Sequence, residues 1–318
     1  MKRKERQTTI KFKPIMKMKR TATIILLLTA VFTGMNAQLL YKISGGNLTK
    51  PSYIVGTYHL APVSFADSIA GLRDAMAQTE QVCGEIDMQQ MMNQEGVQKL
   101  MQAMMLPEGK TLKDILSAEE LARLNAFMNG QMGTDMSNPM VEQQMGRMTP
   151  QALNTQFTLL MYMKHTPGFD PTNLFDGYFQ KAAMESGKPV TGLETVDFQI
   201  KTLYQGMSIE RQKQLLMCLV DNAGYYNDMT LKLSKAYFSQ DITKVKAVMD
   251  EKQNTACDST PEEEASLIDS RNADWLTKMP AMMAGKATLF AVGAGHLPGD
   301  KGVLSLLRNA GYTVEAVK

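Results

Sequence analysis

Cysteine is scarce in this chain, and its three copies lie far apart. They are Cys83, Cys218 and Cys257, in 318 residues. Since no two of them are close in sequence, a cysteine-based metal site is not expected. In an oxidising compartment one disulfide can form, and we expect it to join Cys218 to Cys257 and to leave Cys83 inside a strand. Three buried free thiols are the alternative.

Near the N-terminus, a membrane-spanning apolar run is also missing. The apolar run over 22–32 has 11 residues, which is too short to cross a bilayer comfortably. It follows a basic segment and precedes small and polar residues up to Ala37, the order typical of a cleavable secretory signal. We therefore predict that residues 1–37 are a signal peptide with a possible upstream extension. The remaining 38–318 would be periplasmic or secreted, with no stable membrane span after cleavage, and an uncleaved anchor is the alternative.

Excess basic charge is absent once this leader is removed. The leader holds nine of the 34 Lys and Arg residues and one of the 32 Asp and Glu residues. The other 281 residues then carry 25 basic and 31 acidic side chains, a net charge of about −6. No basic stripe remains to meet phosphates, so nucleic acid is not an expected partner.

Only three histidines are present, and two of them end the same short sequence motif, Gly-x-x-His. Gly56-Thr57-Tyr58-His59 follows the strand-like run 52–55, and Gly293-Ala294-Gly295-His296 follows the strand-like run 287–292. A Gly-x-x-His at the end of a strand turns the backbone sharply and directs the imidazole to the C-terminal rim of the sheet. Open α/β sheets bind ligands at that rim. The third histidine, His165, reads as a loop residue without a metal role.

Helical segments separate the short apolar strands, which predicts an α/β fold with a mostly parallel central sheet and helices on its faces. After the predicted leader, the first expected element is a β-hairpin over 39–55. The stretch 88–165 differs in character, because 14 of the 27 methionines lie in it. We interpret it as a Met-rich helical insertion over one edge of the sheet. Its methionines fit an ordinary helical core, a copper-binding array or a pliable substrate groove.

Four predicted strand ends bear a ligand-type or acidic side chain, namely His59, Glu85, Glu194 and His296. A catalytic metal site needs about three protein ligands and one open position. His59, His296 and Glu85 supply three ligands, and Glu194 then lies nearby as a second acid or base. The alternative is that both glycines only make turns and both histidines hydrogen-bond loop carbonyls.

Several motifs resemble the TraB/GumN family. They are Tyr53-Ile-Val-Gly56-Thr-Tyr-His59-Leu, Gly84-Glu85-Ile-Asp87, Gly192-Leu-Glu194-Thr, Arg271-Asn272 and Phe290-Ala-Val-Gly-Ala-Gly-His296-Leu-Pro-Gly299. The resemblance covers 38–318, apart from the Met-rich stretch. The family is similar to the Tiki proteins, membrane-tethered metal-dependent proteases of Wnt ligands, and more distantly to erythromycin-esterase-type hydrolases and haem-binding ChaN-like proteins.

The resemblance implies metal ligation by His59 and His296, acid roles for Glu85 and Glu194, and a pocket shaped by Arg271 and its neighbour Asn272, which can hold a carboxylate or an oxyanion. Since no C-terminal membrane helix is apparent, the Tiki substrate is not carried over.

We therefore expect a metal-dependent hydrolase, a peptidase by preference, that uses zinc or manganese and takes a peptide or small-molecule substrate. A non-catalytic envelope protein that binds a peptide or small ligand, haem included, is the alternative. A structural envelope protein is a third possibility. The oligomeric state is open.

Overall fold

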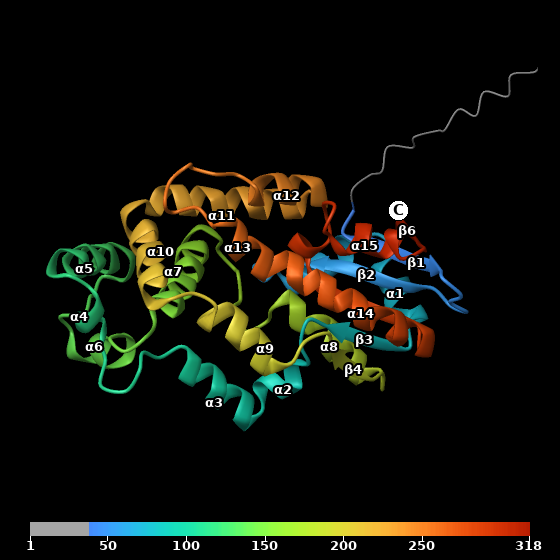
Figure 1. Cartoon of the computed structure of the whole chain (residues 1–318), viewed down its shortest axis with the longest axis horizontal. Helices are drawn as coiled ribbons and strands as arrows, with labels where there is room; N and C mark the ends of the chain where they lie inside the picture. Colours follow the sequence, from blue (N-terminus) through green and yellow to red (C-terminus); the bar gives the residue numbers. More distant parts are fainter. Residues whose placement is uncertain (1–37) are drawn as a thin grey trace, which may run out of the picture. The chain divides into compact units, whose positions relative to one another are not determined.

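The central element of the fold is a single six-stranded sheet. The computed structural model describes residues 38–318 (Figure 1), and the predicted leader lies outside this part of the chain. The strands follow the order β4 (Val190–Gly192), β3 (Gln81–Gly84), β5 (Thr288–Gly293), β2 (Ser52–Thr57), β1 (Leu40–Gly45) and β6 (Tyr312–Ala316). Helices lie on its faces (Figure 1), so the predicted α/β class is confirmed.

The sheet is mixed, and the prediction of a mostly parallel sheet was wrong. Strands β4, β3, β5 and β2 pair in parallel, whereas β1 is antiparallel to both of its neighbours, β2 and β6. The cause is the predicted hairpin. The connection from Gly45 to Ser52 is too short for the crossover that a parallel pair needs, so β1 runs against β2. The four parallel strands still end at one edge.

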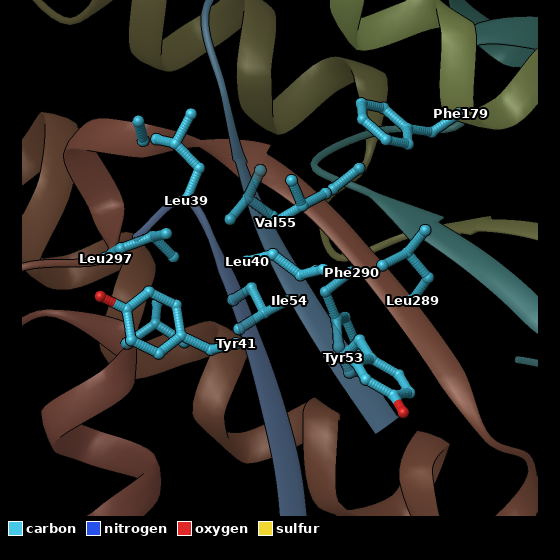
Figure 2. Packing of buried hydrophobic residues seen from close by; sticks show 14 of the residues in the cluster. Leu39, Leu40, Tyr41, Tyr53, Ile54, Val55, Phe179, Leu289, Phe290 and Leu297 are labelled. Carbon is cyan, nitrogen blue, oxygen red and sulfur yellow. The ribbon is translucent and has the colours of Figure 1, made fainter. Parts of the chain in front are cut away.

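Apolar side chains from the middle strands fill the core around the sheet. Ile54 and Val55 of β2 and Leu289 and Phe290 of β5 are fully buried, and Figure 2 shows them packed together with Phe179 from a covering helix. Strands that are buried on both faces have continuous apolar runs rather than alternating ones. This explains why the two strands that precede the histidine motifs were easy to recognise in the sequence.

The elements next to the sheet include both helices and short 3-10 turns. They are η1 (Val63–Ser68), α1 (Leu72–Gln78), α8 (Phe175–Glu185), α14 (Ser270–Gly285), η4 (Ala294–His296) and α15 (Val303–Asn309). At the start of the helix that begins at Pro261, the side chains of Thr260 and Glu263 each bond the other's backbone N–H.

The structure has further helices and π-helical turns, and some of them, such as the helix that carries Ile242 and Val245, also pack into the core around the sheet. They are α2 (Met88–Met92), α3 (Gln94–Ala103), α4 (Leu112–Ile115), α5 (Ala118–Met132), α6 (Pro139–Met145), α7 (Pro150–His165), α9 (Val196–Ile200), the π-helical turn η2 (Lys201–Gln205), α10 (Ile209–Asp221), α11 (Ala223–Phe238), α12 (Ile242–Met249), α13 (Pro261–Glu264) and the π-helical turn η3 (Ala265–Asp269). The boundary between α10 and α11 falls at Asn222.

The Met-rich stretch 88–165 is helical throughout most of its length. Its helices α5 and α7 pack against α10, and their buried side chains form a hydrophobic cluster separate from the sheet core. Met128 and Met161 belong to this cluster, whereas Met92 and Met101 are exposed. The main partners of the stretch are therefore other helices rather than an edge of the sheet.

The predicted disulfide is present. Cys218 of α10 is bonded to Cys257, and Cys83 is a buried free cysteine in β3.

His165 is the last residue of α7 and not a loop residue, and it is exposed. Within residues 38–318, no helix is both long and apolar enough to span a membrane.

Candidate functional site

The four predicted site residues follow four neighbouring parallel strands. His59 lies two residues after β2, Glu85 directly after β3, Glu194 two residues after β4, and His296 at the end of η4, after β5. Since the parallel pairing aligns the C-terminal ends of these strands, the residues that follow them gather at one edge of the sheet. Backbone bonding strengthens this arrangement, because the N–H of Glu194 donates to the carbonyl of Glu85 at 2.7 Å.

The glycines of the two histidine motifs allow close packing at this edge. A Cβ on Gly56 would lie 3.0 Å from the Cα of Ala294, so the loop after β5 packs directly on the backbone of β2. The N–H of Gly293 donates to Oε1 of Glu85 at 2.8 Å, and a Cβ there would lie 3.2 Å from the same oxygen. Each glycine thus leaves room for the neighbouring motif.

The guanidinium of Arg271, on α14, joins three of the predicted residues. Its Nε and Nη2 donate to the two oxygens of Glu194 at 2.6 and 3.0 Å. Nη2 also donates to Oε2 of Glu85 at 2.5 Å. Nη1 donates to the carbonyl of Leu267 at 3.1 Å and to Nε2 of His296 at 3.1 Å. Arginine has five N–H donors, so every donor of Arg271 already has an acceptor within the protein.

Glu194 is enclosed by the residues that bind it. Besides the two bonds from Arg271, its Oε1 accepts the indole N–H of Trp275 at 2.8 Å, and its side chain is 0% exposed. The Glu85 side chain is 18% exposed. Of the two glutamates, only Glu85 is therefore accessible to a water molecule or a substrate.

His296 is a buried, neutral imidazole with a defined tautomer. Because Arg271 can only donate, Nε2 of His296 must accept, and the ring proton is on Nδ1. Nδ1 donates to Oδ1 of Asn272 at 2.7 Å. Asn272 in turn donates to the carbonyls of His296 and Lys301, which fixes its own amide. Burial lowers the pKa of His296 to about 4, and the charge of Arg271 acts in the same direction.

The indole of Trp275 also packs against the His296 ring, with 4.4 Å between the ring centroids. A single tryptophan thus supports two members of the site, because its N–H binds Glu194 and its face contacts His296. Trp275 follows Arg271 by four residues on α14, so both side chains are on one face of this helix.

Glu85 remains ionised although it lies among protein atoms. Burial raises the pKa of Glu85, but the neighbouring His296 and Arg271 and the bond from the Gly293 N–H outweigh it, and the net pKa is below the ordinary value. Gln199 of α9 also donates to Oε2 of Glu85, at 3.3 Å. Oε1 of Glu85 lies 3.9 Å from Nε2 of His296.

His59 lies at the open side of the site. Its side chain is 75% exposed, and its Nδ1 is 2.6 Å from Oδ2 of Asp176. The charge of Asp176 and this hydrogen bond raise the pKa of His59 to about 9. The charge of Glu85 also raises the pKa of His59, and His59 in turn acts on the pKa of His296, so both histidines belong to one electrostatic neighbourhood.

Sequence reasoning missed Asp176, Trp275 and Gln199. Asp176 comes from the first turn of α8, away from the strand ends that carry the other acids of the site. Trp275 was detectable in principle, because it is the chain's single tryptophan and follows Arg271 by one helical turn. Gln199 lies five residues after Glu194, with no pattern that marks it.

The nitrogen and oxygen atoms of the site are of the types that bind a divalent metal, but they are not arranged around a common metal position. His59 and His296 each have Nδ1 bonded to an oxygen, which is the usual support of a histidine that binds metal through Nε2. Two ligands of a tetrahedral ion lie about 3.4 Å apart, close to the 3.9 Å between Glu85 and His296. In the part of the chain that is described, no group of three or more His, Cys, Asp or Glu is placed to hold an ion. The guanidinium of Arg271 contacts both Glu85 and His296 instead.

Comparison with known proteins identifies one family. A family model described as the TraB/PrgY/gumN family matches residues 39–316. No curated protein and no solved structure matched the chain significantly.

Proposed function

The chain belongs to the TraB/PrgY/gumN family, and we propose that it is a secreted or periplasmic metal-dependent hydrolase that acts on peptide bonds. The observation that carries the proposal is the state of His296. It is neutral, its Nδ1 proton is held by Asn272, and its Nε2 lone pair lies 3.9 Å from a carboxylate oxygen of Glu85. Such a nitrogen and such an oxygen are the donors that zinc and manganese accept.

His59, His296 and Glu85 would hold the ion. The chemistry that a divalent ion supplies when bound is Lewis acidity, which favours the attack of water on a carbonyl near neutral pH. Glu85 is our candidate for accepting the proton of the attacking water, because it is the glutamate that solvent reaches. Glu194 holds Arg271 in place, since both of its oxygens are bonded to that guanidinium.

We propose a role for Arg271 in hydrolysis that depends on the N–H that Nη1 donates to Nε2 of His296. Nε2 of His296 has one lone pair, so it cannot accept from Arg271 and bind an ion at the same time. When Nη1 of Arg271 gives up this contact, one N–H becomes free beside the site. That N–H would then donate to the carbonyl oxygen of a substrate, where negative charge develops during hydrolysis.

Metal analysis of the purified protein tests this proposal. We expect about one divalent ion per chain, and we expect His59→Ala and His296→Ala each to abolish stoichiometric binding. His165→Ala is the matched control, because His165 is exposed at the end of α7, and it should bind as the unmodified protein does. Binding that survives both substitutions would refute the metal site.

Cleavage of a peptide library separates catalysis from binding. We expect chelator-sensitive cleavage that Glu85→Gln abolishes, because Glu85 is both a proposed ligand of the ion and the proposed proton acceptor. Metal binding together with peptide retention but no cleavage under any condition would instead favour a ligand-binding protein.

A further inference from the structure

Asp176 is a charged residue that no motif assigns to the site, yet it contacts His59 directly. Its Oδ2 accepts the Nδ1 hydrogen of His59 at 2.6 Å, and its Oδ1 accepts the hydroxyl of Thr57. Thr57 is the last residue of β2, two residues before His59. One carboxylate thus binds both the end of the strand and the side chain that follows it.

Asp176 belongs to a helix that packs on the sheet, whereas His59 lies in the turn that follows β2. Asp176 lies in the first turn of α8, where the helix dipole stabilises negative charge. Phe175 and Phe179 of this helix are fully buried, and α8 packs on β3 and β5. The pKa of Asp176 lies below its ordinary value, because the charge and hydrogen bond of His59 outweigh the effect of burial.

The position of the His59 ring depends on few contacts. Its side chain is mostly exposed, so packing does little to select a rotamer. Among the hydrogen bonds of residues 38–318, the one to Asp176 is the only one that involves the His59 ring. Since the carboxylate can only accept, Nδ1 carries a hydrogen, and Nε2 is the nitrogen left for another ligand.

We propose that Asp176 is a positioning residue, which holds the His59 ring so that its Nε2 faces the site and thereby sets the affinity for a divalent ion without binding the ion itself. This inference rests on the proposed function. Carboxylates that orient a metal-binding histidine typically change metal affinity 10- to 100-fold, so the effect is measurable.

The first test needs no metal. Long-range ¹H–¹⁵N spectra of the histidine rings, recorded on the metal-free protein at one fixed pH, report on Nδ1. Because the chain has only three histidines, His59→Ala identifies the His59 signals. We expect a hydrogen-bonded Nδ1 proton on His59 that is lost in Asp176→Ala and weakened in Asp176→Asn. His59 signals that are the same in the unmodified protein, Asp176→Ala and Asp176→Asn would overturn the proposal.

The second test measures the dissociation constants of Zn²⁺ and Mn²⁺ by calorimetry. We expect Asp176→Ala to weaken binding about 10- to 100-fold and Asp176→Glu to restore part of it. Thr57→Val is the control, because it removes the other donor to Asp176 and keeps the contact with His59. It should change affinity less than 3-fold.

The outcomes distinguish the two proposals. Equal ion affinity in the unmodified protein and Asp176→Ala overturns the role of Asp176 and leaves the proposed function standing. An unmodified protein that binds no ion, but whose His59 spectrum depends on Asp176, refutes the proposed metal site and supports the positioning of the ring. Asp176→Asn nearly preserves the shape of the side chain, so it serves if Asp176→Ala fails to fold.

Discussion

Arg271 and Glu194 form a buried, two-pronged ion pair at the centre of the site. Their side chains are 5% and 0% exposed, and Nε of Arg271 lies 2.6 Å from Oε1 of Glu194. The pair joins α14 to the end of β4, so it ties a covering helix to the edge strand of the sheet. Its two charges lie away from water, and each depends on the other.

We predict that Glu194→Gln lowers the free energy of unfolding by about 3–5 kcal/mol, because it leaves the buried guanidinium without its main counter-charge. Urea unfolding followed by circular dichroism measures this. Glu95→Gln is the comparison, since Glu95 pairs with Lys99 at the surface and its loss should cost less than about 1 kcal/mol. Equal losses in the two variants would show that Arg271 does not need Glu194.

Gly56→Ala should destabilise the protein by about 1–3 kcal/mol, because the new methyl group overlaps Ala294 and Leu297. Gly177→Ala is a matched control. Gly177 is inside α8 and an added Cβ meets nothing within 4 Å there, so alanine should leave stability unchanged or raise it by up to about 1 kcal/mol. Thermal unfolding of the two variants shows whether each substitution raises or lowers the stability of the protein. A neutral Gly56→Ala would mean that the loop after β5 moves aside freely.

Reduction of the disulfide should lower the free energy of unfolding by about 4 kcal/mol in the chain-entropy treatment, because the bond closes a loop between residues 39 positions apart. The measurement compares urea unfolding with and without reductant. Cys83→Ser should show the same reductant effect, since Cys83 is unpaired. An unchanged midpoint under full reduction would contradict this account.

The ion pair of Arg211 with Glu263 predicts a pH dependence of stability. The hydrogen bond from Arg211 lowers the pKa of Glu263, and both side chains are mostly buried. A carboxyl group whose pKa is lower in the folded state stabilises it above the ordinary glutamate pKa, and this contribution is lost as the pH falls through the lowered value. The stability difference between the unmodified protein and Glu263→Gln should therefore be about 2 kcal/mol at pH 7 and shrink toward pH 3. A difference that grows on acidification would reverse the sign and refute the argument.

Much of the site could be predicted because strand ends are marked in the sequence. The apolar runs before Gly56 and Gly293 identified two buried strands, and the parallel pairing of β2 with β5 then placed His59 and His296 at one edge. The antiparallel part of the sheet was predicted only in part. The hairpin over 39–55 already implies that β1 is antiparallel to β2. Nothing local in β6 indicates that its partner is β1, since pairing between distant strands depends on the whole fold.

The contacts within the site were less predictable than its members. Asp176 reaches His59 across 117 residues, from the first turn of a helix. The roles of the two glutamates also depended on three-dimensional information. Glu85 and Glu194 are alike in sequence setting, each near a strand end after a glycine, and only the enclosure of Glu194 by Arg271 and Trp275 separates them.

The full engagement of the five Arg271 donors has a consequence for inhibitor discovery. A carboxylate or phosphonate fragment screened against the metal-free protein would find no vacant hydrogen on this guanidinium, so an acidic group would gain no hydrogen bond from Arg271. The same library screened with zinc or manganese present would meet a different recognition surface. Comparing the two sets of hits therefore gives a chemical fingerprint of the site before any natural substrate is known.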